Sequence, residues 1–253
     1  MNIKIISLLG ILITGGVMGW FLNGAEDTTP KVSTEPKTTM SEMQELTTVT
    51  NAADFVSVRP AITSLPEQTI SEEERSGLIF MREEEKLARD VYSVLYDKWG
   101  MQIFSNIAQS EQTHTEAVRT ILIKYNITDP VTDDTVGVFV NSDLQKLYTD
   151  LTTQGNQSAE NALKVGALIE DLDIADLQKQ IAQTDNDDIK LVYENLMRGS
   201  RNHLRSFVSQ LTTRGTTYTP QYISQSEFDT IIASAQETGS GGENGVRGWG
   251  KNR

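Results

Sequence analysis

The chain has 253 residues, contains no cysteine and carries a formal net charge of −13. A strongly acidic balance argues against nucleic acid as a partner, because phosphate binding requires a basic surface. Without cysteine there are no disulfides and no lipid attached through a cysteine, so stability has to come from a hydrophobic core or from bound metal.

Residues 1–24 contain a nearly continuous apolar run from Ile5 to Leu22, preceded by Lys4. Such a segment is typical of a secretory signal peptide or of an N-terminal membrane anchor. The run is long for a signal peptide, and Asn23-Gly24-Ala25 is a poor cleavage site, which favours the anchor. Both readings predict an exported protein, either anchored to the membrane by its N-terminus or secreted or periplasmic.

Two further segments lack the periodicity of a packed fold. Residues 25–69 are rich in Thr, Ser, Pro and acidic groups, and we expect a disordered linker. Residues 237–253 are rich in glycine, which predicts a flexible tail. The remaining residues, 70–236, are enough for one domain with its own core.

Helical periodicity dominates this domain. Ser71 and Glu74 form a capping-box pattern at the start of the first long helix, and Gly100 ends it. The expected long helices run from Ser71 to Trp99, from Gln102 to Tyr125, from Ser158 to Ala182, and from Asp185 or Asn186 to Thr213. Short helices are expected from Ser142 to Thr153 and after Ser224, and a short extended piece from Val136 to Val140.

The connections between these helices predict their topology. The first two long helices are joined by a very short turn, so they must lie antiparallel, and the last two are joined equally closely. A long crossover, residues 128–157, connects the two pairs. The sequence therefore predicts an all-α fold, a ferritin-like four-helix bundle with one long crossover and short accessory helices.

One of the two histidines lies in Glu111-x-x-His114, within the second long helix. Residues three apart project from one helix face, so this carboxylate and this imidazole lie side by side. Bundles that bind two metal ions use such pairs as ligands, although a single pair is a weak signal.

Each long helix has polar residues in the middle of its apolar stripe. The stripe of the first helix is Leu78, Met81, Glu85, Ala88, Tyr92 and Leu95. The stripe of the second is Phe104, Ile107, Glu111, His114, Val118, Ile121 and Tyr125. The stripe of the third is Leu163, Gly166, Glu170, Asp173, Leu177 and Ile181. The stripe of the fourth is Tyr193, Leu196, Ser200, His203, Phe207 and Leu211.

Buried carboxylates at one level would repel each other unless cations compensated them. Two divalent ions would balance the four carboxylates, and each histidine would add one nitrogen ligand. The predicted metal ligands are Glu85, Glu111, His114, Glu170, Asp173 and His203. Taken singly, each has a plainer reading: a solvated acidic run for Glu85, a hydrogen-bonded core histidine for His203, and an outward-facing side chain for Glu170 or Asp173.

The residues resemble a known superfamily. Glu85-x-x-Ala88-Arg89-x-x-Tyr92, Glu111-x-x-His114 and Gly166-x-x-x-Glu170-x-x-Asp173 are similar to the rubrerythrin branch of the ferritin-like proteins. More closely, the runs Glu83 to Tyr92, Ser110 to His114 and Gly199 to His203 resemble an uncharacterised prokaryotic domain family of ferritin-like fold, with no established activity to carry over. The resemblance covers about residues 70–232.

The resemblance implies the same six ligands, with Glu170 as the bridging glutamate of the third helix. This chain departs from the pattern at Ser200, where the fourth helix should carry a glutamate three residues before His203. Glu194 cannot replace it, since nine residues place it on the opposite helix face. An asymmetric site is therefore expected, with Ser200 on its open side and with two irons, a mixed or manganese pair, or a single metal bound.

Histidine and carboxylate ligands suit iron first and manganese second. A di-iron centre with an open position would react with dioxygen or peroxide, as an oxidoreductase of peroxidase type. Without cysteines for a rubredoxin-like module, it would need a separate electron donor. Tyr92 is either a packing aromatic or a group that supports the centre, and a homodimer is a further expectation. The alternatives are a tethered metal-binding or structural module without redox turnover and a metal-free interaction domain.

Overall fold

The computed structural model describes residues 59–60 and 62–238. The predicted signal peptide or anchor, the linker up to residue 58 and the tail beyond residue 238 lie outside the described residues. Within the described ranges the fold is all-helical, without a strand, as predicted. No helix in this part of the chain is both long enough and apolar enough to cross a membrane.

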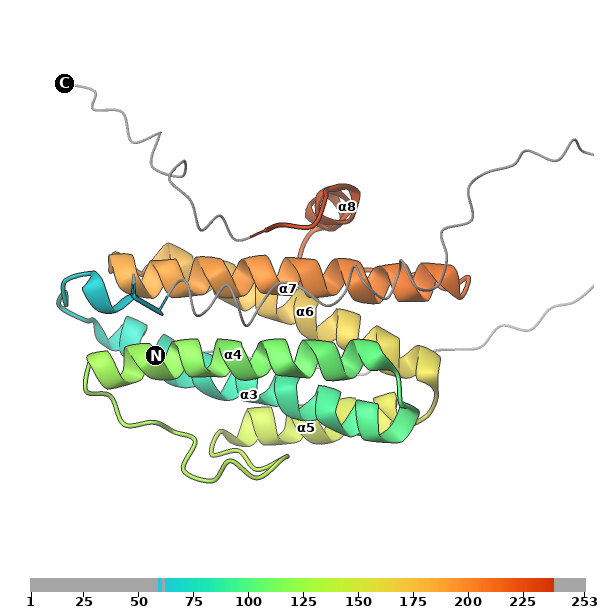
Figure 1. The fold of residues 1–253 in the computed structure, drawn as a ribbon, viewed down its shortest axis with the longest axis horizontal. Coiled ribbons are helices and arrows are strands. Elements are labelled where there is room, and N and C mark those ends of the chain that lie inside the picture. The colour runs from blue at the N-terminus through green and yellow to red at the C-terminus, as the bar shows by residue number, and fades with distance from the viewer. Residues whose placement is uncertain (1–58, 61, 239–253) are drawn as a thin grey trace, which may run out of the picture. The chain divides into compact units, whose positions relative to one another are not determined.

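The described domain contains four long helices and two shorter ones, preceded by a helical turn at residues 62–64 (Figure 1). They are α3 (Glu72–Trp99), α4 (Gln102–Lys124), α5 (Ser142–Gly155), α6 (Ala159–Gln183), α7 (Asp187–Thr213) and α8 (Gln225–Ala233). All six were expected, and their ends differ from the predicted ones by at most a few residues, which is the usual uncertainty of a frayed helix end.

Local capping explains where several of these helices begin and end. The Ser71 side chain accepts a hydrogen bond from the Glu74 backbone N–H, and the Glu74 carboxylate accepts one from the Ser71 backbone N–H, which completes the predicted capping box of α3. Gly100 ends α3 in the left-handed conformation, with φ of 62°. This conformation suits glycine because it has no Cβ, and it lets the chain turn at once into α4.

The long helices pack in two pairs, α3 with α4 and α6 with α7. The pairs meet where α3 contacts α6 and α4 contacts α7, and α5 packs against both α3 and α6. Their shared interior contains a cluster of aromatic rings, Tyr92, Phe104 and Phe207, with centroids 5.4–6.3 Å apart. The predicted stripes face this interior: apart from Ile181, which is partly buried, every stripe residue is buried.

The crossover between α4 and α5 is irregular, and the extended piece expected over Val136 to Val140 is wrong. Residues 136–137 form a turn, and residues 138–140 pair with no strand among the described residues. Side chains of α3 hold this loop instead. The Glu83 carboxylate accepts hydrogen bonds from the backbone N–H groups of Val140 and Asn141, and the Asp90 carboxylate accepts one from Gly137.

The domain extends slightly beyond its predicted limits. Ile62 is fully buried, and Lys124 donates to the backbone carbonyls of Ile62 and Leu65, so residues 62–69 pack on the domain, although the linker was expected to continue to residue 69. At the other end, Glu237 pairs with Arg201 and Arg205 of α7, so the tail begins later than predicted. Single apolar or charged residues that anchor a polar segment give no periodic pattern, so the sequence does not reveal them.

Candidate metal centre

All six predicted ligands are buried near the middle of the long helices. None is more than 7% exposed. Glu85 comes from α3, Glu111 and His114 from α4, Glu170 and Asp173 from α6, and His203 from α7. The solvated-face reading of Glu85 and the outward-facing reading of Glu170 or Asp173 are therefore wrong, because these side chains lie inside the domain.

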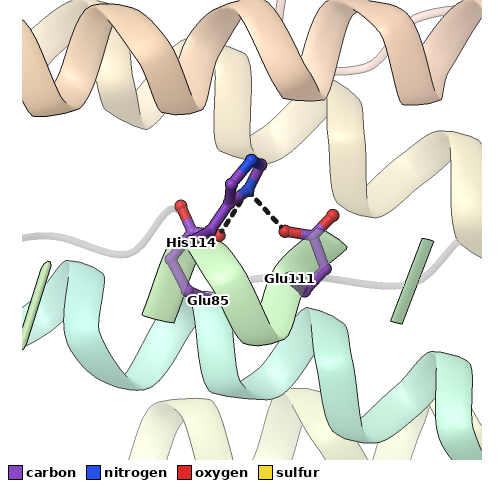
Figure 2. Close-up of side chains that lie close together, drawn as sticks. All are labelled: Glu85, Glu111 and His114. Atoms are coloured by element: carbon purple, nitrogen blue, oxygen red, sulfur yellow. Dashed lines mark ion pairs between the residues drawn. The ribbon is translucent and has the colours of Figure 1, made fainter. Parts of the chain in front are cut away.

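The first group of predicted ligands joins α3 and α4 (Figure 2). The Nδ1 atom of His114 lies 2.7 Å from Glu111 Oε2 and 3.3 Å from Glu85 Oε2. Figure 2 shows both carboxylates turned toward the His114 ring. One ligand atom from each of the three residues lies within 4.8 Å of the others, an arrangement that could hold a metal ion.

The second group joins α4 to α6 and α7. The Nδ1 atom of His203 lies 2.8 Å from Glu111 Oε1 and 3.4 Å from Glu170 Oε2. Again one atom from each residue lies within 4.8 Å of the others. Glu111 belongs to both groups, one oxygen toward each histidine. Glu111 is therefore the carboxylate that the two groups share, whereas the family resemblance implied Glu170 as the bridging glutamate.

The two groups offer matching donors. Each has an imidazole nitrogen, a carboxylate of its own and the shared Glu111, and the two imidazole rings stack with centroids 5.7 Å apart. The asymmetry expected from Ser200 is therefore not visible in the donor types of the two groups.

Asp173 lies outside both groups. The Ser200 hydroxyl donates a hydrogen bond to its Oδ2 atom, and its buried Oδ1 atom has no hydrogen-bond partner among the described residues. Serine at this position thus binds a carboxylate from α6, where the family pattern would place a carboxylate on α7 itself.

Tyr92 belongs to the aromatic cluster and also contacts the second group. Its buried hydroxyl donates to Glu170 Oε1 and lies 3.3 Å from the carbonyl oxygen of Gly166. The tyrosine therefore both packs in the core and contacts a candidate ligand.

Two glycines of α6 and α7 make room for buried rings. An added Cβ on Gly199 would lie 2.5 Å from Cε1 of His114, and one on Gly166 would lie 2.4 Å from Cε1 of Phe207. Both distances are shorter than any ordinary contact, so α7 can approach His114, and α6 can approach Phe207, because these positions lack a side chain.

The electrostatics favour positive charge at both groups. Burial disfavours an ionised Glu111, but His114 and His203 outweigh burial and lower the pKa of Glu111. Burial likewise opposes an imidazolium, yet Glu111 and Glu170 raise the pKa of His203 to about 9, and Glu111 and Glu85 raise the pKa of His114. In this arrangement, protons bound by His114 and His203 compensate the negative charge of the shared Glu111.

For Glu85 and Asp173, burial is the largest cause of the change in pKa. Burial raises the pKa of Glu85 to about 7, against the opposing effect of His114. Burial together with Glu85 raises the pKa of Asp173. Glu85 Oε1 is also buried without a hydrogen-bond partner among the described residues. These acceptors without donors fit a divalent cation, which would replace protons as the compensating charge.

Two further buried features of α3 were not predicted from the sequence. Lys86 and Asp90 form an ion pair of 2.6 Å in which both side chains are fully buried, and their spacing of four residues was a signal that could have revealed it. Glu84 is also buried, although it reads as part of an acidic run.

Comparison with known proteins places the domain in a family. The profile of an uncharacterized protein domain, DUF2202, matches residues 74–235. The chain belongs to the DUF2202 family. It is similar to the uncharacterized protein MJ0754 of Methanocaldococcus jannaschii, with 63% identity over 178 residues, which are 70% of this chain and 96% of that protein.

The fold of this DUF2202 protein is similar to a solved structure. The crystal structure of hypothetical protein MJ0754 matches it with a TM-score of 0.68 and 63% identity, over 69% of this chain and 99% of that one. The resemblance to an uncharacterised domain family is thereby confirmed.

Proposed function

We propose that the DUF2202 domain is a ferritin-like four-helix bundle that binds two divalent cations between its helices. The observation that carries this proposal is the shared carboxylate of Glu111, which points one oxygen toward each of two matching groups. Glu85 and His114 would hold one ion, and Glu170 and His203 the other, a ligand arrangement typical of two-metal bundles.

Iron suits these ligands best, and manganese second, because the donors are imidazole nitrogens and carboxylate oxygens without sulfur. When bound, two iron ions would supply electrons for the reduction of dioxygen or peroxide. The protein's own residues would hold the ions, exclude water by burial and fix Glu170 through Tyr92. Asp173 is then a neighbouring acid, and its position beside Ser200 leaves it available to change partners.

We also propose how the protein is exported and tethered and what it requires for turnover. Residues 1–24 would export the protein, as a signal peptide or as an anchor, and residues 25–58 would tether the domain. A separate electron donor would be required for turnover, because the chain contains no cysteine for a thiolate-ligated redox centre. A homodimer stays a prediction.

The alternative function is a metal-binding or structural module without redox turnover. The ion pairs of Glu111 with both histidines favour it, because they compensate the buried charges even with protons as the only cations.

Metal analysis of the purified full chain tests the proposal. We expect two ions per chain after loading with iron(II) and desalting, near zero in Glu111→Gln, and about one in His203→Ala. Glu160→Gln, an exposed acid of α6 paired with Lys164, is the matched control and should bind as the parent does.

Absence of bound metal, or equal binding by Glu111→Gln and the parent, would refute the site. Loaded protein is then mixed with dioxygen or peroxide and its optical spectrum is recorded. A spectral change in the parent supports the redox function. Two bound ions with no spectral change would favour the alternative.

A further inference from the structure

Glu84 is a buried acid whose role the two ligand groups do not explain. It precedes Glu85 on α3 and is 5% exposed. Neither of its carboxylate oxygens has a hydrogen-bond partner within the described residues. An ionised carboxylate in such surroundings is strongly destabilising unless something compensates its charge.

Other buried acids of the described domain show how structural carboxylates are satisfied here. Asp171 accepts hydrogen bonds from Tyr218 and from three backbone N–H groups, and Asp90 pairs with Lys86. The acids with such donors are Glu74, Glu83, Asp90, Asp171 and Asp188. Glu84 departs from this pattern, which argues against a purely structural role.

The neighbours of Glu84 are themselves acids. Its side chain interacts with that of Asp176 on α6, and Asp173 and Glu85 are close enough to repel it. Two carboxyl groups can share a hydrogen bond only if one is protonated, so Asp176 offers no donor when both are ionised. Asp173, one helical turn before Asp176, adds its own unpaired Oδ1 atom.

This row of acids leads outward from the candidate metal centre. Asp173 is 7% exposed, whereas 24% of the Asp176 side chain is exposed. The Nζ atom of Lys179 lies 4.0 Å from Oδ1 of Asp176. The row therefore starts next to the ligands and reaches solvent between α3 and α6.

We infer that Asp176, Glu84 and Asp173 form the entry route by which divalent cations reach the centre. The inference rests on the proposed function. A cation captured at Asp176 finds a carboxylate oxygen at each step inward, so it exchanges water for hard oxygen ligands gradually. The three carboxylates also attract cations to this side of the domain, where Lys179 is the neighbouring cation, and they raise the rate of association about 10-fold or more.

The test separates the rate of loading from the final amount bound. Cobalt(II) is mixed with the full chain in a stopped-flow instrument, and its visible absorption in nitrogen and oxygen coordination is followed. We expect Glu84→Gln and Asp176→Asn to load about 10-fold more slowly than the parent and to reach the same final number of ions. Glu160→Gln, an exposed acid on the same helix with its own lysine neighbour, is the control and should load at the parent's rate.

The outcomes are distinguishable from failure of the proposed function. If the parent binds no cobalt, the centre itself is refuted. If the parent binds two ions and both variants load at its rate, the entry route is overturned. A lower final number of ions in Glu84→Gln would also overturn it, because Glu84 would then be a ligand. Asp176→Asn, at a partly exposed position, keeps the test valid if Glu84→Gln misfolds.

Discussion

At residue 199 the absence of a side chain allows α7 to lie against the His114 ring. The space is specific to this ring, because an added Cβ would come within 2.6 Å of Nε2 as well as 2.5 Å of Cε1. The His114 ring is buried and lies beside Glu111, which also contacts His203, so the ring has little freedom to move aside.

Gly199→Ala should therefore disturb metal binding more than stability. Overpacking costs about 1–3 kcal/mol, while alanine returns about 1 kcal/mol of helix propensity. We expect a moderate loss of thermal stability and at least a tenfold loss of affinity at the His114 group, since misplaced ligands bind poorly. Metal titration followed by calorimetry, together with thermal unfolding, measures both effects.

Gly155→Ala is the control for this variant. Its Cβ would press on a Leu95 methyl group, 2.6 Å away, at the end of α5. It should lower stability by a similar amount and leave metal affinity unchanged. Equal affinity in Gly199→Ala and the parent would show that the His114 ring does not depend on this space.

For single residues, the sequence predicts which side chains face the interior better than it predicts their contacts there. Periodicity places Glu85, Glu111 and Glu170 on inward faces, because a helix advances about 100° per residue. It cannot say which oxygen points where, and so it missed that Glu111 is shared and that Asp173 turns to Ser200. Those details depend on side-chain rotamers and on the approach of helices far apart in the chain.

Among the elements, α3 combines three tasks on three faces. Glu85 and Tyr92 face the candidate metal centre, Glu84 faces α6, and Glu83 with Asp90 holds the crossover loop. This division explains why charged residues crowd one buried helix segment. Apolar periodicity alone would assign most of these charges to solvent.

The buried pair Lys86–Asp90 of α3 also contacts the crossover loop. Lys86 also donates to the carbonyl oxygens of Thr135 and Val138, and its Nζ lies 4.5 Å from the centroid of the Phe139 ring. Removing the partner of a buried charge costs about 3–5 kcal/mol. Asp90→Asn should accordingly destabilise the domain by about 3 kcal/mol, measured by urea denaturation.

The chain supplies a matched control in Lys146–Asp150, which has the same spacing of four residues on α5 but is solvent-exposed. Asp150→Asn should cost little, since exposed pairs are screened by water and salt. Similar losses in the two variants would contradict the argument that burial, rather than pairing, gives Lys86–Asp90 its importance.

The helices themselves were predictable because their signals are local. The Ser71 capping box, Gly100 and the short connections between helix pairs each act within a few residues. The crossover loop was not predictable, since residues 135–141 are held by side chains of α3 about fifty residues away in the chain. No local pattern encodes such contacts.

For the whole molecule, the candidate metal centre links stability to pH. Folding raises the pKa of Glu85 to about 7 and that of His203 to about 9, so the folded state binds more protons than the unfolded state. A group whose pKa is higher in the folded state contributes its full stabilisation at pH values below its unfolded pKa. That contribution is lost as the pH rises through its folded pKa. Folding lowers the pKa of Glu111, so this residue changes the stability only at acidic pH values below its unfolded pKa.

Without metal, the domain should therefore lose stability between about pH 5 and pH 9, first as Glu85 ionises and then as His203 deprotonates. Bound divalent ions supply the positive charge that the protons no longer provide, and they compete with those protons for the same atoms. The gain in Tm on adding manganese(II) should consequently be small at pH 6 and several-fold larger at pH 8.5. Thermal unfolding at constant ionic strength, with and without the ion, measures this difference, and Glu111→Gln should abolish it. A gain that is independent of pH would mean that the ion binds away from these histidines, because only there do protons and the cation compete.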